Sequence, residues 1–333
     1  MQSDNGNSNP LNDGEQMQAI PIDELLLRKE LPIDVYVLLP TGRYLLVGKR
    51  DTPSEPVKRY KLRDVNMLYV RTADYHEFVR STVEEATVLV NAEWVSNDQR
   101  VEGVRNAMAA VHHEIATLGF DDQVLGRAKT VSSATLSVIS KSPKLVDLLA
   151  KLGDLSNDNT RHSMSVSVIA SMLGVAQGWV KPGTIEKLAL IGFLHDVGKT
   201  ALPPDLINKR PEALTGDDLI IYQSHPESGA QLLAQAKSVP DDVILAVKEH
   251  HELADGSGFP EGKRDLLLSP LARVISLADA FVTMVDEDPK RMTAEKAREA
   301  VEKLTFHKAH LYNRDALKAL HKLFPQVAKK AAG

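Results

Sequence analysis

The sequence contains no cysteine among its 333 residues. Disulfide bonds, thiolate metal ligands and a cysteine nucleophile are therefore excluded. Any metal ion has to be held by histidine, carboxylate and water, a ligand set that suits iron, manganese, cobalt, nickel, zinc or magnesium. Aromatic residues are scarce, at 5%, and most of the 43% of apolar residues are leucine, valine, isoleucine and alanine. This balance favours a mainly helical protein.

Long apolar runs are also absent. One of the longest, residues 188–194, contains Gly192 and is far shorter than the about 20 apolar residues that a membrane span needs. The first residues are polar and lack the apolar segment of a secretory signal. The formal charge is −5, which gives no support to a surface for nucleic acid polymers. We therefore expect a cytoplasmic protein that binds neither a membrane nor a nucleic acid polymer.

The length is enough for two domains. Residues 1–17 are rich in Asn, Asp, Ser and Gly, which is typical of a disordered tail. Residues 18–95 are predicted to form a small α+β regulatory or interaction domain. Its predicted strands lie at 34–39 and 44–47, on either side of a hairpin turn, and at 60–62 and 67–70.

Residues 96–155 are predicted to be connecting helices, because apolar residues recur there at spacings of three and four. Residues 156–333 are predicted to form an all-helical domain, so the fold class is mainly α with a small α+β domain before it. His112 and His113 lie in the connecting region. A pair of histidines on a helix suggests a metal site, but a solvated or packed helix face is the better interpretation here because no matching ligands flank the pair.

Histidine and aspartate residues recur in order over the C-terminal half. A lone histidine is more often packed or exposed than a metal ligand, but the joint occurrence of this set favours a metal centre. A carboxylate can bridge two metal ions, and two ions about 3.5–4 Å apart can share a hydroxide that attacks phosphorus. An aspartate on an otherwise apolar helix also needs a partner or a metal. The set is His162, His195, Asp196, His225, His250, His251 and Asp279.

These motifs resemble the HD-GYP family, a subgroup of the HD-domain metal-dependent phosphohydrolases. The resemblance covers about residues 155–300. It is carried by the runs His195-Asp-Val-Gly-Lys199, His225-Pro226, His250-His-Glu-Leu-Ala-Asp-Gly-Ser-Gly-Phe-Pro260 and Ala278-Asp279. The resemblance implies an all-helical domain with a centre of two or three metal ions, often iron or manganese. It also implies hydrolysis of cyclic di-GMP to a linear dinucleotide or to GMP.

The resemblance also implies roles for single residues. His162, His195, Asp196 and Asp279 would hold one metal ion, and Asp196, His225, His250 and His251 would hold the other. Lys199 would lie beside the scissile phosphate, as a cation that stabilises transition-state charge or as a proton donor. Asp158 occupies the position of a third-metal ligand. Because family members with a third metal have the longer glutamate there, we expect two divalent ions rather than three.

The sequence departs from the family at the groups that bind substrate. Phe259 replaces the tyrosine of the substrate loop, although Gly256, Gly258 and Pro260 are kept. Val282 replaces a second aspartate, and Asp288 replaces an arginine that contacts phosphate in family members. An acidic group there would repel a dianionic ligand. Arg291, Lys290 and Arg210 are candidates to compensate, and Arg291 is expected to supply the phosphate contact together with Lys199.

Three functions stay open on the sequence alone. The first is a metal-dependent phosphodiesterase acting on cyclic di-GMP or a related cyclic dinucleotide through a metal-bridging hydroxide. The second is a non-catalytic, metal-containing receptor for a cyclic dinucleotide or a protein-interaction module. The third is a phosphohydrolase acting on another phosphate ester. Further expected partners are a GGDEF-type or other signalling protein and a second copy of the chain in a homodimer.

Overall fold

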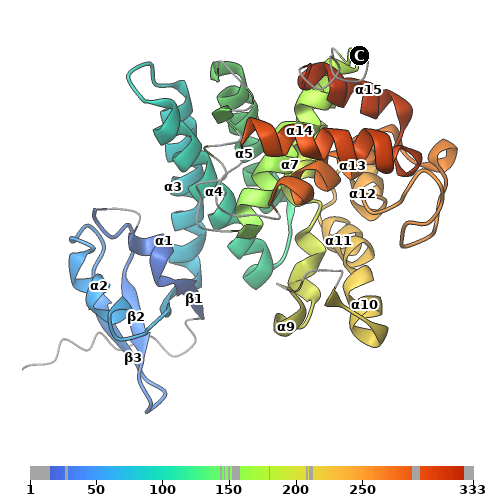
Figure 1. Cartoon of the computed structure of the whole chain (residues 1–333). Coiled ribbons are helices and arrows are strands. Elements are labelled where there is room, and N and C mark those ends of the chain that lie inside the picture. The colour runs from blue at the N-terminus through green and yellow to red at the C-terminus, as the bar shows by residue number, and fades with distance from the viewer. Residues whose placement is uncertain are drawn as a thin grey trace, which may run out of the picture. The chain divides into compact units, whose positions relative to one another are not determined.

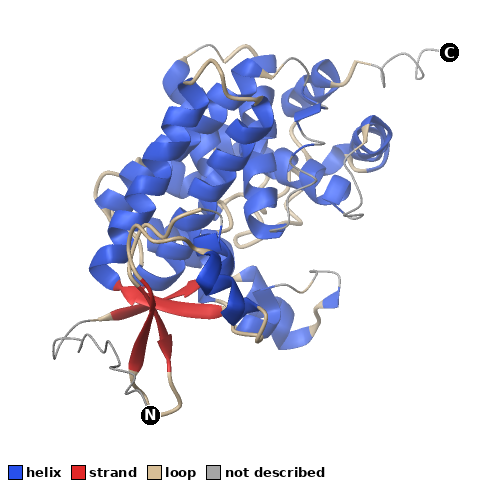
Figure 2. Ribbon diagram, turned by 90° about the vertical axis from the view of Figure 1, so that its left-hand side faces the viewer, coloured by secondary structure: helices blue, strands red, loops and turns tan. Residues whose placement is uncertain are grey.

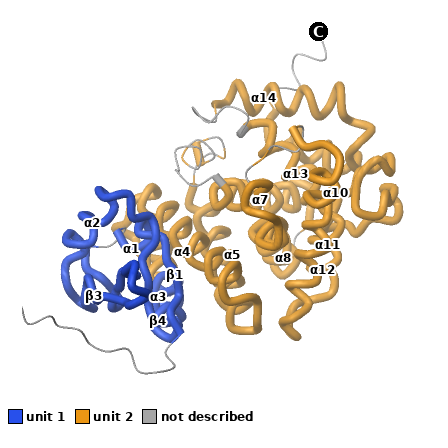
Figure 3. Tube along the Cα trace, turned by 90° about the horizontal axis from the view of Figure 1, so that it is seen from below, with its two compact units in different colours: residues 1–84 blue, residues 85–333 orange. Residues whose placement is uncertain are grey.

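The chain divides into two compact units, residues 1–84 and residues 85–333 (Figure 3). The boundary falls within helix α3 (Thr72–Asn91). All strands of the described residues lie in the first unit, and helices dominate the second (Figures 1 and 2). The computed structural model describes residues 16–26, 29–142, 145, 147–148, 151, 158–179, 181–207, 209, 213–286 and 293–325.

The first unit is built on an antiparallel sheet with the strand order β1-β4-β2-β3. The predicted hairpin is confirmed, since β2 pairs with β3 and the N–H of Leu39 donates to the carbonyl of Arg43 across the turn. Gly42 has a φ of +78°, which a glycine adopts without strain. The strands are β1 (Met17–Pro21), β2 (Val35–Leu38), β3 (Tyr44–Gly48) and β4 (Met67–Arg71).

Two expectations for this unit were wrong. Residues 60–62 form no strand. Tyr60 and Lys61 are the last residues of α2 (Glu55–Lys61), which has Pro56 in its first turn, and Leu62 follows the helix as its C-cap. A short apolar run does not separate a helix from a strand, and Leu62 is 85% exposed. Met17, which we expected to be the last residue of the tail, begins β1 and pairs with Arg71. The rest of the predicted tail, residues 1–15, lies outside the described residues.

The long helix α3 was also missed, because the elements predicted within residues 18–95 were all strands. Its buried residues Tyr75, Val79, Ala86 and Val90 lie on one helical face. That spacing is the apolar period of a helix rather than of a strand. The first unit also contains the short helix α1 (Ile22–Leu26), which buries Ile22 and Leu25.

The second unit is helical over its described residues. Its first two helices begin with side-chain caps: Ser96 and Gln99 form a capping box on α4, and the Asp121 carboxylate accepts two backbone N–H groups of α5. The elements are α4 (Asn97–Leu118), α5 (Asp122–Lys141), α7 (Asp158–Ala176), α8 (Pro182–Leu194), η1 (Val197–Ala201), α9 (Pro204–Ile207), α10 (Gly216–Gln223), α11 (His225–Leu233), α12 (Asp241–Lys248), η3 (Asp265–Leu267), α13 (Pro270–Asp286), α14 (Ala294–Glu302), η4 (Lys303–His307), η5 (Ala309–Leu311) and α15 (Arg314–Leu323).

Helices α7, α8 and α13 form the centre of this unit and pack against one another. At Gly192 the backbones of α8 and α7 approach so closely that an added Cβ would meet the backbone of Ser167. The Ser167 hydroxyl donates to the carbonyl of Ala189 at 2.8 Å, deep in this contact. The close approach fixes α7 and α8 side by side, and both carry residues of the metal-ligand set.

The predicted fold class is confirmed: the structure is mainly helical, and a small antiparallel sheet precedes a helical domain. Within the described residues, no helix combines the length and the apolar character that crossing a membrane requires.

Candidate metal centre

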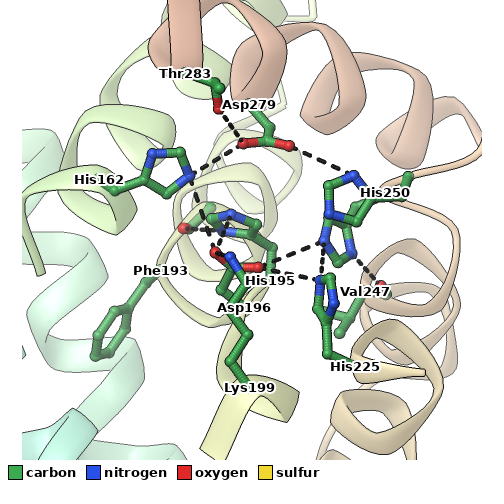
Figure 4. A network of polar contacts seen from close by, with 12 residues as sticks. His162, Phe193, His195, Asp196, Lys199, His225, Val247, His250, Asp279 and Thr283 are labelled. Carbon is green, nitrogen blue, oxygen red and sulfur yellow. Dashed lines mark hydrogen bonds and ion pairs between the residues drawn. The ribbon is translucent and has the colours of Figure 1, made fainter. Parts of the chain in front are cut away.

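All seven histidine and aspartate residues of the sequence-derived set converge in the second unit (Figure 4). They come from segments far apart in the chain. Three of the segments are helix ends or the turns that follow them, where neighbouring side chains can diverge toward different partners. The positions are His162 in α7, His195 and Asp196 after α8, His225 at the start of α11, His250 and His251 after α12, and Asp279 in α13.

Asp196 lies between two sets of imidazoles. Its Oδ1 is 3.3 Å from Nε2 of His225 and 3.7 Å from Nε2 of His250. Its Oδ2 is 3.4 Å from Nε2 of His195 and 4.0 Å from Nε2 of His162. The ligand atoms form two groups, each within 4.8 Å: Asp196, His225, His250 and His251 in one, and His162, His195 and Asp279 in the other.

Three buried histidines are held in one orientation by their own backbone. In each, Nδ1–H donates to the carbonyl three residues earlier, which leaves the Nε2 lone pair free to face the centre. This is the tautomer of a metal-ligating histidine whose second nitrogen is hydrogen-bonded. The bonds run from His195 to Gly192 at 2.9 Å, from His225 to Tyr222 at 2.7 Å and from His250 to Val247 at 2.6 Å.

The imidazole and carboxylate atoms that face the centre suit a divalent metal ion. Nε2 of His225 and Nε2 of His250 lie 3.3 Å apart, and because both Nδ1 atoms carry the proton, two lone pairs face each other. Nε2 of His195, Oδ1 of Asp196 and Nε2 of His251 are buried without a hydrogen-bond partner. Buried acceptors without donors are unfavourable, and a shared cation would satisfy them.

The protonation states also suit metal binding, which needs neutral imidazole and ionised carboxylate. Burial lowers the pKa of His195 to about 4, against the opposing effect of Asp196. Burial likewise lowers the pKa of His225 and of His251. Burial alone would raise the pKa of Asp196, but the charges of Lys199 and His195 outweigh it and hold that pKa well below its usual range.

Asp279 is the carboxylate on the apolar helix α13. Its Oδ1 lies 3.0 Å from Nε2 of His162 and accepts a hydrogen bond from the Thr283 hydroxyl at 3.3 Å. Its Oδ2 lies 3.7 Å from Nδ1 of His251. Burial would raise the pKa of Asp279, but its hydrogen bond and charge interaction with His162 lower it. Asp279 is thus ionised, and it contacts His162 of its own group and His251 of the other group.

Lys199 lies beside Asp196, with Nζ 2.6 Å from Oδ2 (Figure 4). Burial would lower the pKa of Lys199, but Asp196 outweighs it and raises that pKa above its usual value. The preceding residue, Gly198, packs against the start of α11. A Cβ there would overlap the carbonyl oxygen of His225 and the backbone nitrogen of Gly229. Only glycine permits this approach, which brings Lys199 beside the ligands of α11.

The substrate loop predicted from the sequence follows His251 directly. A Cβ at Gly258 would overlap the backbone of His251 and Leu253, and Gly256 has a φ of +82°, so both glycines are needed for this conformation. The Phe259 ring stacks on the His251 ring, with centroids 4.7 Å apart, and Pro260 follows it. The loop therefore places an aromatic face, without a hydroxyl, against one of the candidate ligands.

Two buried carboxylates that hold this loop were missed. Glu252 accepts the backbone N–H of Glu261 at 2.6 Å and of Lys263 at 2.9 Å. Glu249 accepts from Lys263 Nζ and from the backbone N–H of Ser269, both at 2.9 Å. Each glutamate is about 2% exposed or less. Their position beside His250 and His251 was the available signal, but their partners become visible only in the folded chain.

Other predicted site residues lie apart from this cluster or outside the described residues. Asp158 begins α7, one turn before His162, but its side chain is not among those described, so the expectation of two ions rather than three stays a prediction. Arg291, Asp288, Lys290 and Arg210 also lie outside the described residues. His112 is hydrogen-bonded through Nε2 to the carbonyl of Phe193 at 3.0 Å and packs on its ring, as the packed-face interpretation predicts.

Comparison with known proteins shows which family this chain belongs to. The HD domain family matches residues 140–316, more than half of the chain. A cyclic di-GMP phosphodiesterase of Pseudomonas aeruginosa is 31% identical over 156 residues, which are 46% of this chain and 37% of that protein. A cyclic di-GMP phosphodiesterase response regulator of Xanthomonas campestris is 28% identical over 174 residues, 52% of this chain and 44% of that protein.

A 3′3′-cGAMP-specific phosphodiesterase of Vibrio cholerae is 27% identical over 185 residues, 55% of this chain and 39% of that protein. The chain thus spans less than half the length of these curated relatives. Among solved structures, an HDGYP-type protein of Bdellovibrio bacteriovorus has a TM-score of 0.66 at 20% identity, covering 93% of this chain and 100% of that chain. At that identity the likeness shows a shared fold.

Proposed function

This chain belongs to the HD domain family, and on that premise we propose that it is a two-metal phosphodiesterase of cyclic di-GMP or a related cyclic dinucleotide. The observation that carries the proposal is the position of Asp196. Its two carboxylate oxygens face different pairs of imidazoles, Oδ1 toward His225 and His250 and Oδ2 toward His195 and His162. A carboxylate placed in this way is suited to join two metal ions.

The names of the relatives support the substrate class. Two are named cyclic di-GMP phosphodiesterases and one a 3′3′-cGAMP-specific phosphodiesterase, so cyclic dinucleotides are the shared chemistry. In the proposed reaction, water attacks one phosphorus of the ring and one ester P–O bond breaks. The leaving ribose oxygen takes up a proton, and the product is a linear dinucleotide with a terminal phosphate.

The roles of the chain's own residues follow from their charges. His162, His195, His225, His250, His251, Asp196 and Asp279 would hold two divalent ions, for which iron and manganese are the proposed identities. When bound, such ions supply Lewis acidity and an activated water molecule. Lys199 keeps its proton because Asp196 raises its pKa. This favours a role as a fixed cation beside the phosphate over a role as proton donor.

The test is metal quantification of anaerobically purified protein, followed by product analysis with a panel of cyclic dinucleotides. We expect two equivalents of metal and release of a linear dinucleotide. Asp196→Ala should lose the metal of both groups and all turnover. Asp217→Ala, at an exposed aspartate of α10, is the matched control and should keep both. Metal-loaded protein that leaves every cyclic dinucleotide intact would overturn the proposed activity.

A second candidate function is a non-catalytic receptor for a cyclic dinucleotide. It is favoured by the Phe259 ring, which stacks on His251 and brings no hydroxyl to the loop. Saturable binding of a cyclic dinucleotide without product would support it, and turnover lost in Asp196→Ala would exclude it. Turnover of another phosphate ester, with all cyclic dinucleotides intact, would instead support the third function.

We further propose that the small α+β domain regulates the helical domain or binds a partner of it. Its boundaries at residues 18 and 95, a GGDEF-type signalling partner and a homodimer stay predictions. Activity compared between the full chain and a chain beginning at residue 96, together with light scattering of the full chain, would test them. Equal activity of both chains would count against a regulatory role.

A further inference from the structure

Tyr222 contacts both the candidate cation, Lys199, and a candidate metal ligand, His225. It ends the apolar face of α10 and is 5% exposed, within a cluster that contains Leu202, Leu206 and Leu214. Its carbonyl accepts the Nδ1–H of His225, and its ring packs edge-on against the His225 ring with centroids 5.0 Å apart. Lys199 Nζ lies over the Tyr222 ring, 5.5 Å from the centroid.

Lys199 therefore has two anchors of different kinds. One is the Asp196 carboxylate, through the 2.6 Å contact with Oδ2. The other is Tyr222: its ring face attracts an ammonium group through the ring quadrupole within about 6 Å, and its hydroxyl also interacts with Lys199, so Tyr222→Phe separates the two contacts. The Asp196 oxygen also faces His195 and His162, so metal binding would draw on the same lone pairs. The aromatic anchor does not compete with metal binding.

Resting on the proposed function, we infer that Tyr222 is a positioning residue that holds the Lys199 ammonium beside the metal centre through its ring face, ready for a substrate phosphate. The cation stays in place when the Asp196 oxygens are engaged elsewhere. The neighbouring side chains support this arrangement. Tyr222 packs against the apolar residues of its cluster. The backbone contact of Gly198 sets the distance between the turn that carries Lys199 and α11, which begins three residues after Tyr222.

The first test measures the contact between Lys199 and the Tyr222 ring directly and does not depend on catalytic turnover. Metal-free protein carrying ¹³C-labelled lysine should show the ε-methylene of Lys199 shifted upfield by the ring, with the signal assigned by its absence in Lys199→Arg. The shift should persist in Tyr222→Phe and disappear in Tyr222→Leu and Tyr222→Met. Leu125→Ala, at a buried position of α5 outside this cluster, controls for general loosening and should leave the shift in place. An unshifted Lys199 signal in the parent protein would overturn the inference.

The second test measures the effect of the contact on kcat in the metal-loaded protein. Cation–π contacts correspond to about 2- to 30-fold in rate, so Tyr222→Leu should lower kcat by that factor with metal content unchanged. The same substitution in a Lys199→Met background should have no further effect, which a merely structural role would not produce. Equal losses in both backgrounds, or a loss in Tyr222→Phe as large as in Tyr222→Leu, would overturn the inference.

The two tests separate this inference from the proposed function. If the parent protein turns over no cyclic dinucleotide, the proposed function fails, and the lysine signal still decides whether Tyr222 holds Lys199. If turnover is present but the lysine signal is the same in Tyr222→Leu as in the parent, the inference fails and the proposed function stands.

Discussion

Nε2 of His112 on α4 lies 3.0 Å from the backbone carbonyl oxygen of Phe193, two residues before His195 on α8. The last carbonyls of a helix have no partner within the helix and need one from outside. At the end of α8, His195 satisfies the carbonyl of Gly192 and His112 satisfies that of Phe193. His112 precedes residues 140–316, so the helix before the matched domain stabilises the turn that carries two candidate ligands.

Replacing His112 should therefore destabilise the second unit. Burial lowers the pKa of His112, so the ring is neutral and donates its Nε2–H to the carbonyl. His112→Phe keeps a ring against Phe193 but leaves the carbonyl unsatisfied, at a cost of about 1–3 kcal/mol. Urea unfolding followed by far-UV circular dichroism measures it. His112→Gln retains a donor and should lose less, and equal losses in both variants would contradict the role of the hydrogen bond.

Metal removal should lower the thermal stability of the second unit. A ligand present at 100 times its Kd stabilises the folded state by about 2.7 kcal/mol, because it binds the folded chain alone. We expect the Tm measured by scanning fluorimetry to fall with a chelator and to recover with Mn²⁺ added in excess. Asp196→Ala, which removes the carboxylate shared by both groups, should abolish the recovery and Asp217→Ala should not. A Tm that is unchanged by the chelator and by added Mn²⁺ would argue against a metal centre.

Glu252 should be the strongest single support of the substrate loop. Its carboxylate accepts two backbone N–H groups from residues 261 and 263 while almost fully buried. Glu252→Gln removes the charge and turns one acceptor into a donor, for an expected loss of about 2–3 kcal/mol in the free energy of unfolding. Limited proteolysis should then cut within residues 253–269. Glu261→Gln, at a more exposed carboxylate of the same loop, should stay within about 1 kcal/mol of the parent.

The pH dependence of stability should carry a contribution from Glu24 in the first unit. Burial raises the pKa of Glu24 from 4.5 to about 8, and its Oε2 is buried without a partner. The unfolded chain ionises near pH 4.5 and the folded chain only near pH 8. The stability that Glu24 contributes is therefore complete below pH 4.5 and is lost as the pH rises toward 8.

Glu24→Gln removes this dependence. At pH 5 the variant and the parent should unfold at similar urea concentrations, whereas at pH 8.5 the variant should be more stable by roughly 4 kcal/mol. Taking the difference between the two proteins at each pH cancels the titration of the other groups. Parallel pH profiles of the two proteins would contradict the raised pKa.

The local features of the sequence predicted the fold class and the composition of the cluster. Residues such as His195 and Asp196 stand in short runs whose order along the chain is visible before folding, and the structure brings those residues together. Helix α3 was also readable in principle, because Tyr75, Val79, Ala86 and Val90 follow the helical period. It was missed because strands on its N-terminal side directed the interpretation toward a sheet.

Other parts of the site have no local signal. Tyr222 is one residue of an apolar helix until α10 is placed next to Lys199. Glu249 and Glu252 become supports of the loop only when residues 261–269 fold back onto them. His112 required contact across 81 residues of sequence. Such roles depend on tertiary packing, which periodicity and spacing do not encode.

The hydrogen bonds from His195, His225 and His250 to the carbonyls three residues before them have a further consequence. Each ring takes its orientation from its own turn of chain, whereas the separation between rings is set by the packing of distant helices. Angle and spacing are thus governed by independent parts of the molecule. A substitution between helices would therefore change the spacing of these three rings without changing the orientation of any of them, and the size of ion that the centre would accept depends on helix packing.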